Sequence, residues 1–116
     1  TIDFSYKAIG KQTFVIDLNP KCYVDLIAPA RTFGFKDQFQ QLGELGLIKG
    51  GSLENALVCD GDNWVNPPLR FANEPVRHKI LDLIGDLALV GLPKAQIIVY
   101  KGSHSLNALL ASSLKI

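Results

Sequence analysis

The stretch from Pro75 to Leu89 constrains the fold of this chain more than any other. Asn73 is a suitable N-cap before it and Gly91 ends the pattern after it, so the signals for one long helix agree. Apolar residues occupy most faces of this helix and leave little of it for solvent. We therefore expect a helix that packs against the rest of the fold over much of its surface.

Short strands and further helices are predicted along the rest of the chain. In order they are a hairpin of residues 1–6 with 12–18, a short helix capped by Asn19 and ended by Pro29, a β-α-β unit (strand Thr32–Phe35, helix Asp37–Leu45, strand Asn55–Cys59), a buried strand Ala95–Tyr100 and a last helix Ser103–Lys115. The 116 residues suffice for one domain. The prediction is an α/β (α+β) fold, a two-layer sandwich of a mixed sheet packed on helices, with a small β-α-β insert at about residues 31–59.

Composition excludes several classes of function. Twelve Lys and Arg against eleven Asp and Glu leave a net charge of +1, too little for a phosphate-backbone partner, so we expect no nucleic acid. The apolar runs are much shorter than the ~18 residues of a membrane span. Cys22 and Cys59 form no CxxC pair, which favours free thiols in a reducing compartment and hence a cytoplasmic protein.

A polar line runs along the predicted long helix. His78, Asp82 and Asp86 recur every four residues, so they project from one stripe with neighbouring Cβ atoms about 5–6 Å apart. The apolar surroundings predict that this stripe is at least partly enclosed. An enclosed carboxylate needs a partner, and a cation, a histidine or a metal ion would serve.

The residues by themselves leave two interpretations of this stripe open. A His at position i with an Asp at i+4 can place a ring nitrogen and a carboxylate oxygen on one divalent ion, but the same spacing fits an exposed His–Asp pair on a solvated helix. A catalytic zinc takes three protein ligands, and His104 is the other histidine of the chain. His104 follows a predicted strand, where ligand-binding loops are common, or is an ordinary residue at a helix start. Lys101 is equally suited to a phosphate or to the surface.

Several consecutive blocks resemble UDP-3-O-acyl-N-acetylglucosamine deacetylase, a zinc hydrolase of lipid A biosynthesis. They are 30–35 (ARTFGF), 46–47 with 50–53 (GL, GGSL), 69–71 (LRF), 76–82 (VRHKILD), 84–87 (IGDL), and Tyr100-Lys101 with His104. Because order and approximate spacing are kept, the resemblance spans nearly the whole chain. It implies that residues 1–116 are the second of the family's two domains, that the first domain is absent, and that the insert helps to build a passage for the substrate acyl chain.

The resemblance also implies roles for individual residues. His78 and Asp82 match two zinc ligands, while the third ligand, a histidine, and the general base belong to the absent first domain. His104 matches the histidine that acts as general acid or electrostatic stabiliser, Asp86 the carboxylate that orients it, and Thr32 the hydroxyl that stabilises the oxyanion. The implied substrate-binding residues are Phe33, Lys79, Lys101, Gly51 and Ser52.

The chain departs from the family pattern at two places and leaves other functions open. Gly102-Ser103 stands where the family has Ser-Gly, and Lys49 stands where many members are apolar. The predicted function is zinc-dependent N-deacetylation of UDP-3-O-acyl-N-acetylglucosamine, with this chain inactive alone and its exposed domain face prone to self-association. The alternatives are a non-catalytic module that binds a nucleotide-sugar or a protein, and a zinc enzyme completed by a second copy.

Overall fold

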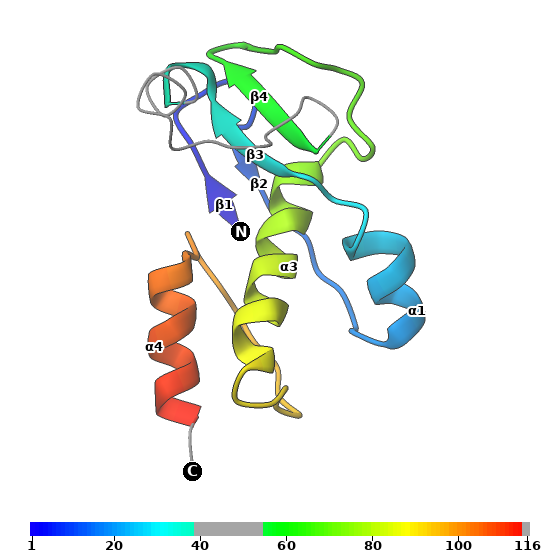
Figure 1. Ribbon diagram of the computed structural model, residues 1–116, viewed down its shortest axis with the longest axis vertical. Coiled ribbons are helices and arrows are strands. Elements are labelled where there is room, and N and C mark those ends of the chain that lie inside the picture. Colours follow the sequence, from blue (N-terminus) through cyan, green and yellow to red (C-terminus); the bar gives the residue numbers. More distant parts are fainter. Residues whose placement is uncertain (39–54, 115–116) are drawn as a thin grey trace.

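In the computed structural model, residues 1–38 and 55–114 are described. The described elements are β1 (Ile2–Asp3), β2 (Lys11–Gln12), α1 (Pro20–Cys22), the π-helix η1 (Tyr23–Ile27), β3 (Thr32–Phe35), β4 (Ala56–Asp60), β5 (Asn63–Trp64), α3 (Glu74–Ala88) and α4 (His104–Leu114). The strands gather at one end of α3, and α4 lies beside α3 (Figure 1). The predicted α+β class is confirmed, with two small sheets among the described residues in place of one mixed sheet.

Both strands of the predicted β-α-β unit are present. β3 pairs in parallel with β4, with Thr32 opposite Ala56, and β5 returns antiparallel to β4 after a turn at Gly61, which has a φ of 62°. A parallel pair requires a crossover connection, in agreement with the predicted insert. Residues 36–38 are helical, and the rest of the predicted helix Asp37–Leu45 lies outside the described residues.

The N-terminal hairpin is shorter than predicted. β1 and β2 pair over two residues each, and residues 13–18 of the predicted strand form no strand and have no ladder partners among the described residues. Phe14 and Ile16 are half-buried while Val15 is exposed, so the alternation that suggested a strand is real. Alternation reports which side chains face the core, whereas a strand also needs a neighbouring backbone to pair with.

One predicted strand is wrong. Residues 95–100 form no strand, and Ile97 and Ile98 are exposed. The end of this segment bonds to Thr1, whose amino group donates to the Val99 carbonyl and whose carbonyl accepts from the Lys101 N–H. A run of β-branched residues sets a preference for extended backbone, but burial of that run depends on tertiary partners.

The helix starts follow the predicted caps in part. Asn19 caps α1, because its Oδ1 accepts the Cys22 N–H at 2.9 Å. Asn73 precedes α3 as predicted, but its side chain makes no capping bond and instead accepts from Arg77 Nε at 2.7 Å. The Arg77 guanidinium also lies over the rings of Phe14 and Phe71, at 4.4 and 3.9 Å from their centroids. The Asn73 side chain is therefore bonded to the Arg77 side chain and not to a backbone N–H at the start of α3.

The core lies between the strands and the start of α3. Ile2, Ile9, Cys59 and Val76 form a buried cluster, and its partly buried neighbours are Phe4, Ala8, Phe14, Phe33, Phe35 and Trp64. This cluster fixes α3 against β3, so residues one turn further along α3 lie close to the start of β3. Among the described residues, no helix is both long enough and apolar enough to cross a membrane.

The side chain of Asn66 extends the small sheet. Its Oδ1 accepts the Val58 N–H at 2.9 Å and its Nδ2 donates to the Ala56 carbonyl at 2.7 Å, as a neighbouring strand would. Asn66→Ala leaves both backbone groups without these partners, and we expect it to lower the free energy of unfolding by about 1–3 kcal/mol. Urea denaturation measures this loss.

Asn63→Ala is the matched control, because Asn63 is exposed and lies on the same sheet. We expect that substitution to change the free energy of unfolding by less than about 0.5 kcal/mol. Equal stabilities for the two variants would contradict the role assigned to Asn66.

Candidate active site

His78 and Asp82 lie one turn apart on α3 and face each other. Nε2 of His78 is 3.2 Å from Oδ1 of Asp82, and the two side chains are only 16% and 18% exposed. The predicted partial enclosure of the polar stripe is confirmed, since an isolated ion pair on a solvated helix would be far more exposed. The helix repeat places the two groups on one face, and packing of α3 against β3 covers them.

The other nitrogen of His78 determines what this pair can bind. Nδ1 is 3.0 Å from the carbonyl oxygen of Ala30, and a carbonyl only accepts, so Nδ1 carries the proton in this bond. On a neutral ring, Nε2 then presents its lone pair to Asp82. The Nε2 lone pair and the Asp82 carboxylate are both acceptors, so the pair suits a cation that lies between them. Without a cation, a proton on Nε2 would join the two groups.

The spacing of the two acceptors fits one zinc ion. Bonds of about 2.0–2.2 Å in a tetrahedral site place two ligand atoms about 3.3 Å apart. Within residues 1–38 and 55–114, no cluster of three or more His, Cys, Asp or Glu side chains could hold a metal. The described part of the chain therefore offers two candidate ligands, which is one short of a catalytic zinc site.

His104, at the start of α4, pairs with Asp86 of α3. Its Nδ1 lies 2.7 Å from Asp86 Oδ2, and the same oxygen accepts the Asn107 side-chain N–H at 3.0 Å. The hydrogen bond to Asp86, with the charges of Asp82 and Asp86, raises the pKa of His104 above its usual value. The hydrogen bonds from Asn107 and His104 lower the pKa of Asp86. The geometry thus favours an imidazolium beside a carboxylate.

The two histidine–aspartate pairs meet at Asp82. His104 Nε2 lies 3.9 Å from Asp82 Oδ2, and the His104 side chain is 70% exposed. Four residues of the predicted site are thus brought together along adjacent turns of α3 and the start of α4. The arrangement combines two possible metal ligands with a histidine that can donate a proton.

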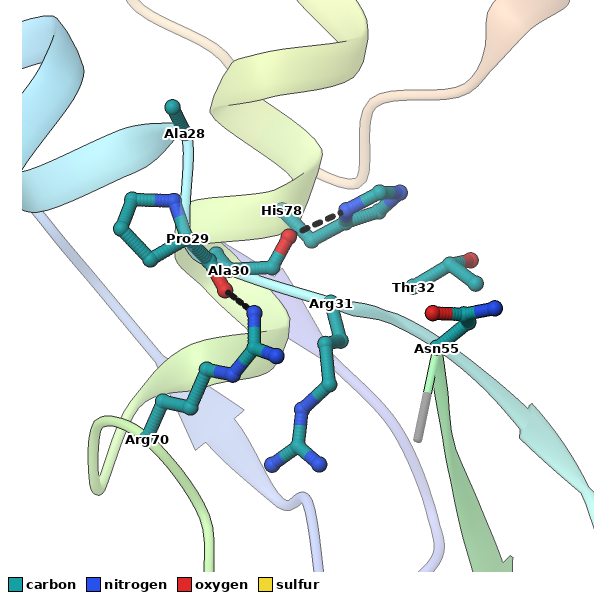
Figure 2. Close-up of a pocket in the computed structure, with 8 residues that line it drawn as sticks. All are labelled: Ala28, Pro29, Ala30, Arg31, Thr32, Asn55, Arg70 and His78. Carbon is teal, nitrogen blue, oxygen red and sulfur yellow. Dashed lines mark hydrogen bonds between the residues drawn. The ribbon is translucent and has the colours of Figure 1, made fainter. Parts of the chain in front are cut away.

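Thr32 and His78 line a pocket of about 270 Å³. Figure 2 shows the His78 ring, Thr32 and Asn55 converging on it, with Arg31 and Arg70 to one side. Thr32 is exposed at the start of β3. Next to Thr32, the ring of Phe33 lies 5.8 Å from Lys79 Nζ, so two of the predicted substrate-binding residues are neighbours.

Of the remaining predicted substrate-binding residues, the structure describes Lys101. Lys101 Nζ lies 5.6 Å from the centroid of its neighbour Tyr100. Gly51 and Ser52, together with Lys49, lie outside the described residues.

The reversed Gly102-Ser103 order has a structural explanation. The positive φ of this loop, 52°, falls on Lys101, whereas a Cβ at Gly102 would come within 2.8 Å of the Val99 side chain. The Ser103 hydroxyl accepts the Leu106 N–H at 3.1 Å and caps α4. Close packing against Val99 therefore favours glycine at 102, and the serine that follows caps α4.

Sequence reasoning missed two contributors to the site. Asn107 follows His104 by three residues on a predicted helix, and this spacing places both on one face, so the pattern could have shown it. The Ala30 carbonyl is backbone, and no residue type reveals where a carbonyl points. Both act by orienting the groups that were predicted.

A second groove lies beside His104, between α3 and α4. It measures about 600 Å³ and is lined by Asp86, Leu89, Val90, His104, Ala108, Ala111 and Ser112. Two of these lining residues, Leu89 and Val90, are 87% and 43% exposed. Exposed apolar side chains therefore border the groove next to His104.

Comparison with known proteins identifies the family. The chain matches the family described as UDP-3-O-acyl N-acetylglycosamine deacetylase over residues 1–115, and it belongs to that family. It is 55% identical over 114 residues to the UDP-3-O-acyl-N-acetylglucosamine deacetylase of Synechocystis sp., and 56% identical over 114 residues to that of Thermosynechococcus vestitus. A probable mitochondrial deacetylase of the same name from Arabidopsis thaliana is 48% identical over 118 residues.

The alignments include nearly all of this chain and less than half of each relative. They cover 97%, 97% and 96% of the chain, against 41%, 39% and 33% of the Synechocystis, Thermosynechococcus and Arabidopsis proteins. The chain therefore corresponds to a minor part of these relatives by length.

The raised pKa of His104 is directly measurable. In the chelator-treated chain, we expect an NMR titration of the His104 ring to give a midpoint above the ordinary value of about 6.5. Asp86→Asn removes the charge and weakens the hydrogen bond, so the midpoint should fall. Because the folded-state pKa is raised, this pair stabilises the fold below the unfolded pKa and the contribution is lost as pH rises through the folded one.

Asp62→Asn controls for a general change in charge, because Asp62 is exposed and distant in sequence from the pair. A midpoint that follows the Asp62 substitution as strongly as the Asp86 substitution would show that the specific contact is not the cause.

Proposed function

We propose that this chain supplies part of the active site of a zinc-dependent deacetylase that removes the N-acetyl group of UDP-3-O-acyl-N-acetylglucosamine in lipid A biosynthesis. The main support is the 3.2 Å approach of His78 Nε2 to Asp82 Oδ1 with Nδ1 engaged by a carbonyl, next to the His104–Asp86 pair. Membership of the deacetylase family and the names of the relatives support the substrate.

His78 and Asp82 would hold the metal in this proposal. Their donor atoms are an imidazole nitrogen and a carboxylate oxygen, both of which zinc accepts, at a separation that suits one ion. When bound, zinc acidifies a water molecule and polarises the acetamide carbonyl. The third ligand and the general base come from outside residues 1–116.

His104 would deliver the proton to the leaving amine. Its Nδ1 is occupied by Asp86, so the proton available to a substrate is the one on Nε2. That nitrogen faces Asp82 at 3.9 Å on a mostly exposed ring, at the edge of the proposed metal site. Asp86 would keep the ring protonated, and the Nε2 proton would pass to the amine nitrogen as the C–N bond breaks.

Thr32 would stabilise the oxyanion, and its neighbours would bind the nucleotide-sugar. The Thr32 hydroxyl is exposed in the pocket that His78 also lines, where a donor could meet the negative oxygen. Phe33 offers a ring face to the sugar, and Lys79 a charge beside that ring. Lys101, Gly51 and Ser52 complete the proposed substrate contacts, with Lys101 near the diphosphate.

The chain would act as the second domain of a two-domain enzyme in the cytoplasm. It spans about two fifths of the Synechocystis relative, and its exposed apolar groove borders His104. A first domain that carries the third ligand and the base would cover this face. In its absence, the same face favours self-association.

Reconstitution tests the proposed division of the active site. With zinc present, we expect the chain alone not to deacetylate UDP-3-O-acyl-N-acetylglucosamine, and its mixture with a separately produced first domain of the Synechocystis relative to do so. Removing the metal with a chelator should abolish the activity, and zinc should restore it. The measurement is release of acetate.

Controls separate this proposal from its alternatives. His78→Ala should abolish activity in the mixture, while Asp60→Ala, at an exposed carboxylate, should leave it unchanged. Activity of the chain alone, rising with its dimer fraction, would instead support an enzyme completed by a second copy. Substrate binding without hydrolysis in any mixture would favour a non-catalytic nucleotide-sugar module.

The pH dependence tests the role of His104. In the reconstituted enzyme, we expect His104→Gln to lower kcat by about 10²–10⁴-fold, as loss of a general acid does. Asp86→Asn should move the basic limb of the kcat/KM profile to lower pH, because the pKa of His104 falls when its partner is neutral. An unchanged basic limb would contradict the assignment.

A further inference from the structure

Glu74 is a fully buried carboxylate in the first turn of α3. Its side chain is 0% exposed, and each of its two carboxylate oxygens accepts two N–H groups. Oε2 accepts from the backbone N and the Nε of Arg31, both at 2.8 Å, and Oε1 accepts from Arg31 Nη2 at 3.1 Å and the Arg70 backbone N at 2.7 Å. Burial alone would raise the pKa of Glu74, but these hydrogen bonds outweigh it and the pKa is lowered.

The donors belong to two loops that also bind each other. Arg31 Nη2 donates to the Pro68 carbonyl at 3.2 Å. Arg70 Nη1 donates to the Pro29 carbonyl at 2.8 Å, a bond that Figure 2 shows. The segment from Pro29 to Arg31 is therefore held at both ends. Ala30, at its centre, is 4% exposed and has little room to move.

A single peptide group connects Glu74 to His78. The N–H of Arg31, which Glu74 accepts at 2.8 Å, and the C=O of Ala30, which accepts from His78 Nδ1 at 3.0 Å, belong to the same planar unit. In a trans peptide these two groups point in opposite directions. Glu74 and His78 are one helical turn apart on α3, so the peptide bridges two side chains of one helix face.

We propose that Glu74 is a positioning residue for His78: through the Ala30–Arg31 peptide it fixes the ring orientation and places the ring proton on Nδ1. The negative charge at the N–H end strengthens the carbonyl as an acceptor at the other end. His78 Nε2 is then left bare and directed at Asp82. The consequence for metal binding rests on the proposed function, whereas the tautomer of His78 does not.

The tautomer is measured by NMR on the chain with ¹⁵N-labelled histidine rings. Asp82→Asn serves as the background, because an amide can donate to or accept from Nε2 and so leaves the choice of tautomer to the Nδ1 side. At a pH about two units above the ordinary histidine pKa of about 6.5, we expect His78 in this background to carry its proton on Nδ1. A bare Nδ1 there would overturn the proposal, whatever the other variants do.

Adding Glu74→Gln tests the coupling. The Gln amide group must present N–H to some of the four donors, so the peptide loses its fixed orientation. We expect the ratio of the Nδ1–H to the Nε2–H form to fall about tenfold, the effect of losing one hydrogen bond. An unchanged ratio in a folded Glu74→Gln chain would show that Glu74 serves stability alone.

Arg31→Lys is the matched control for stability. It removes the guanidinium bonds to Glu74 but keeps the backbone N–H that Glu74 accepts. We expect this variant to lower the melting temperature without shifting the tautomer ratio. A shift as large as that of Glu74→Gln would overturn the relay through the peptide.

Discussion

The ion pair between Glu74 and Arg31 is the interaction on which the candidate site depends. A buried carboxylate is tolerated only when its lone pairs are satisfied, and here four N–H groups satisfy them. Removing one partner of such a pair typically costs about 3–5 kcal/mol, because the other charge is left buried. The ion pair therefore holds the start of α3 against the segment that leads into β3. That segment contains both Ala30 and Thr32.

The two histidines of the site differ in what accepts their Nδ1 proton. For His78 the acceptor is the neutral Ala30 carbonyl, which selects Nδ1 as the protonated nitrogen and leaves Nε2 free to face Asp82. For His104 it is the Asp86 carboxylate, whose hydrogen bond and charge raise the pKa of the ring. In the proposed mechanism, one side-chain type would thus serve as ligand in one place and as proton donor in the other, because the acceptors differ in charge.

The placement of the site was predictable from sequence because α3 is a long helix with agreeing end signals. Its repeat puts His78, Asp82 and Asp86 on one stripe, and the structure keeps them there. The parallel pairing of β3 with β4 likewise follows from the predicted β-α-β unit. These features depend on local periodicity, which a single sequence records well.

The parts that could not be predicted depend on contacts between distant segments. The run 95–100 looks like a buried strand, but its burial depends on which backbone lies beside it. The position of Asn73 predicts a capping bond, but its side chain accepts a hydrogen bond from Arg77 instead. The Arg77 guanidinium is placed by two aromatic rings that come from distant parts of the chain. The contact of the Ala30 carbonyl with His78 depends on the fold. It could not be predicted from sequence, because every residue has a carbonyl.

The most direct test of the account is the position of zinc in crystals of the chain assembled with a first domain. Anomalous X-ray scattering at the zinc absorption edge locates the metal without any assumption about its ligands. The account predicts a peak about 2.0–2.2 Å from His78 Nε2 and from an Asp82 oxygen, with His78 Nδ1 still on the Ala30 carbonyl. A metal bound through His78 Nδ1, or one held by His104 without His78, would contradict it.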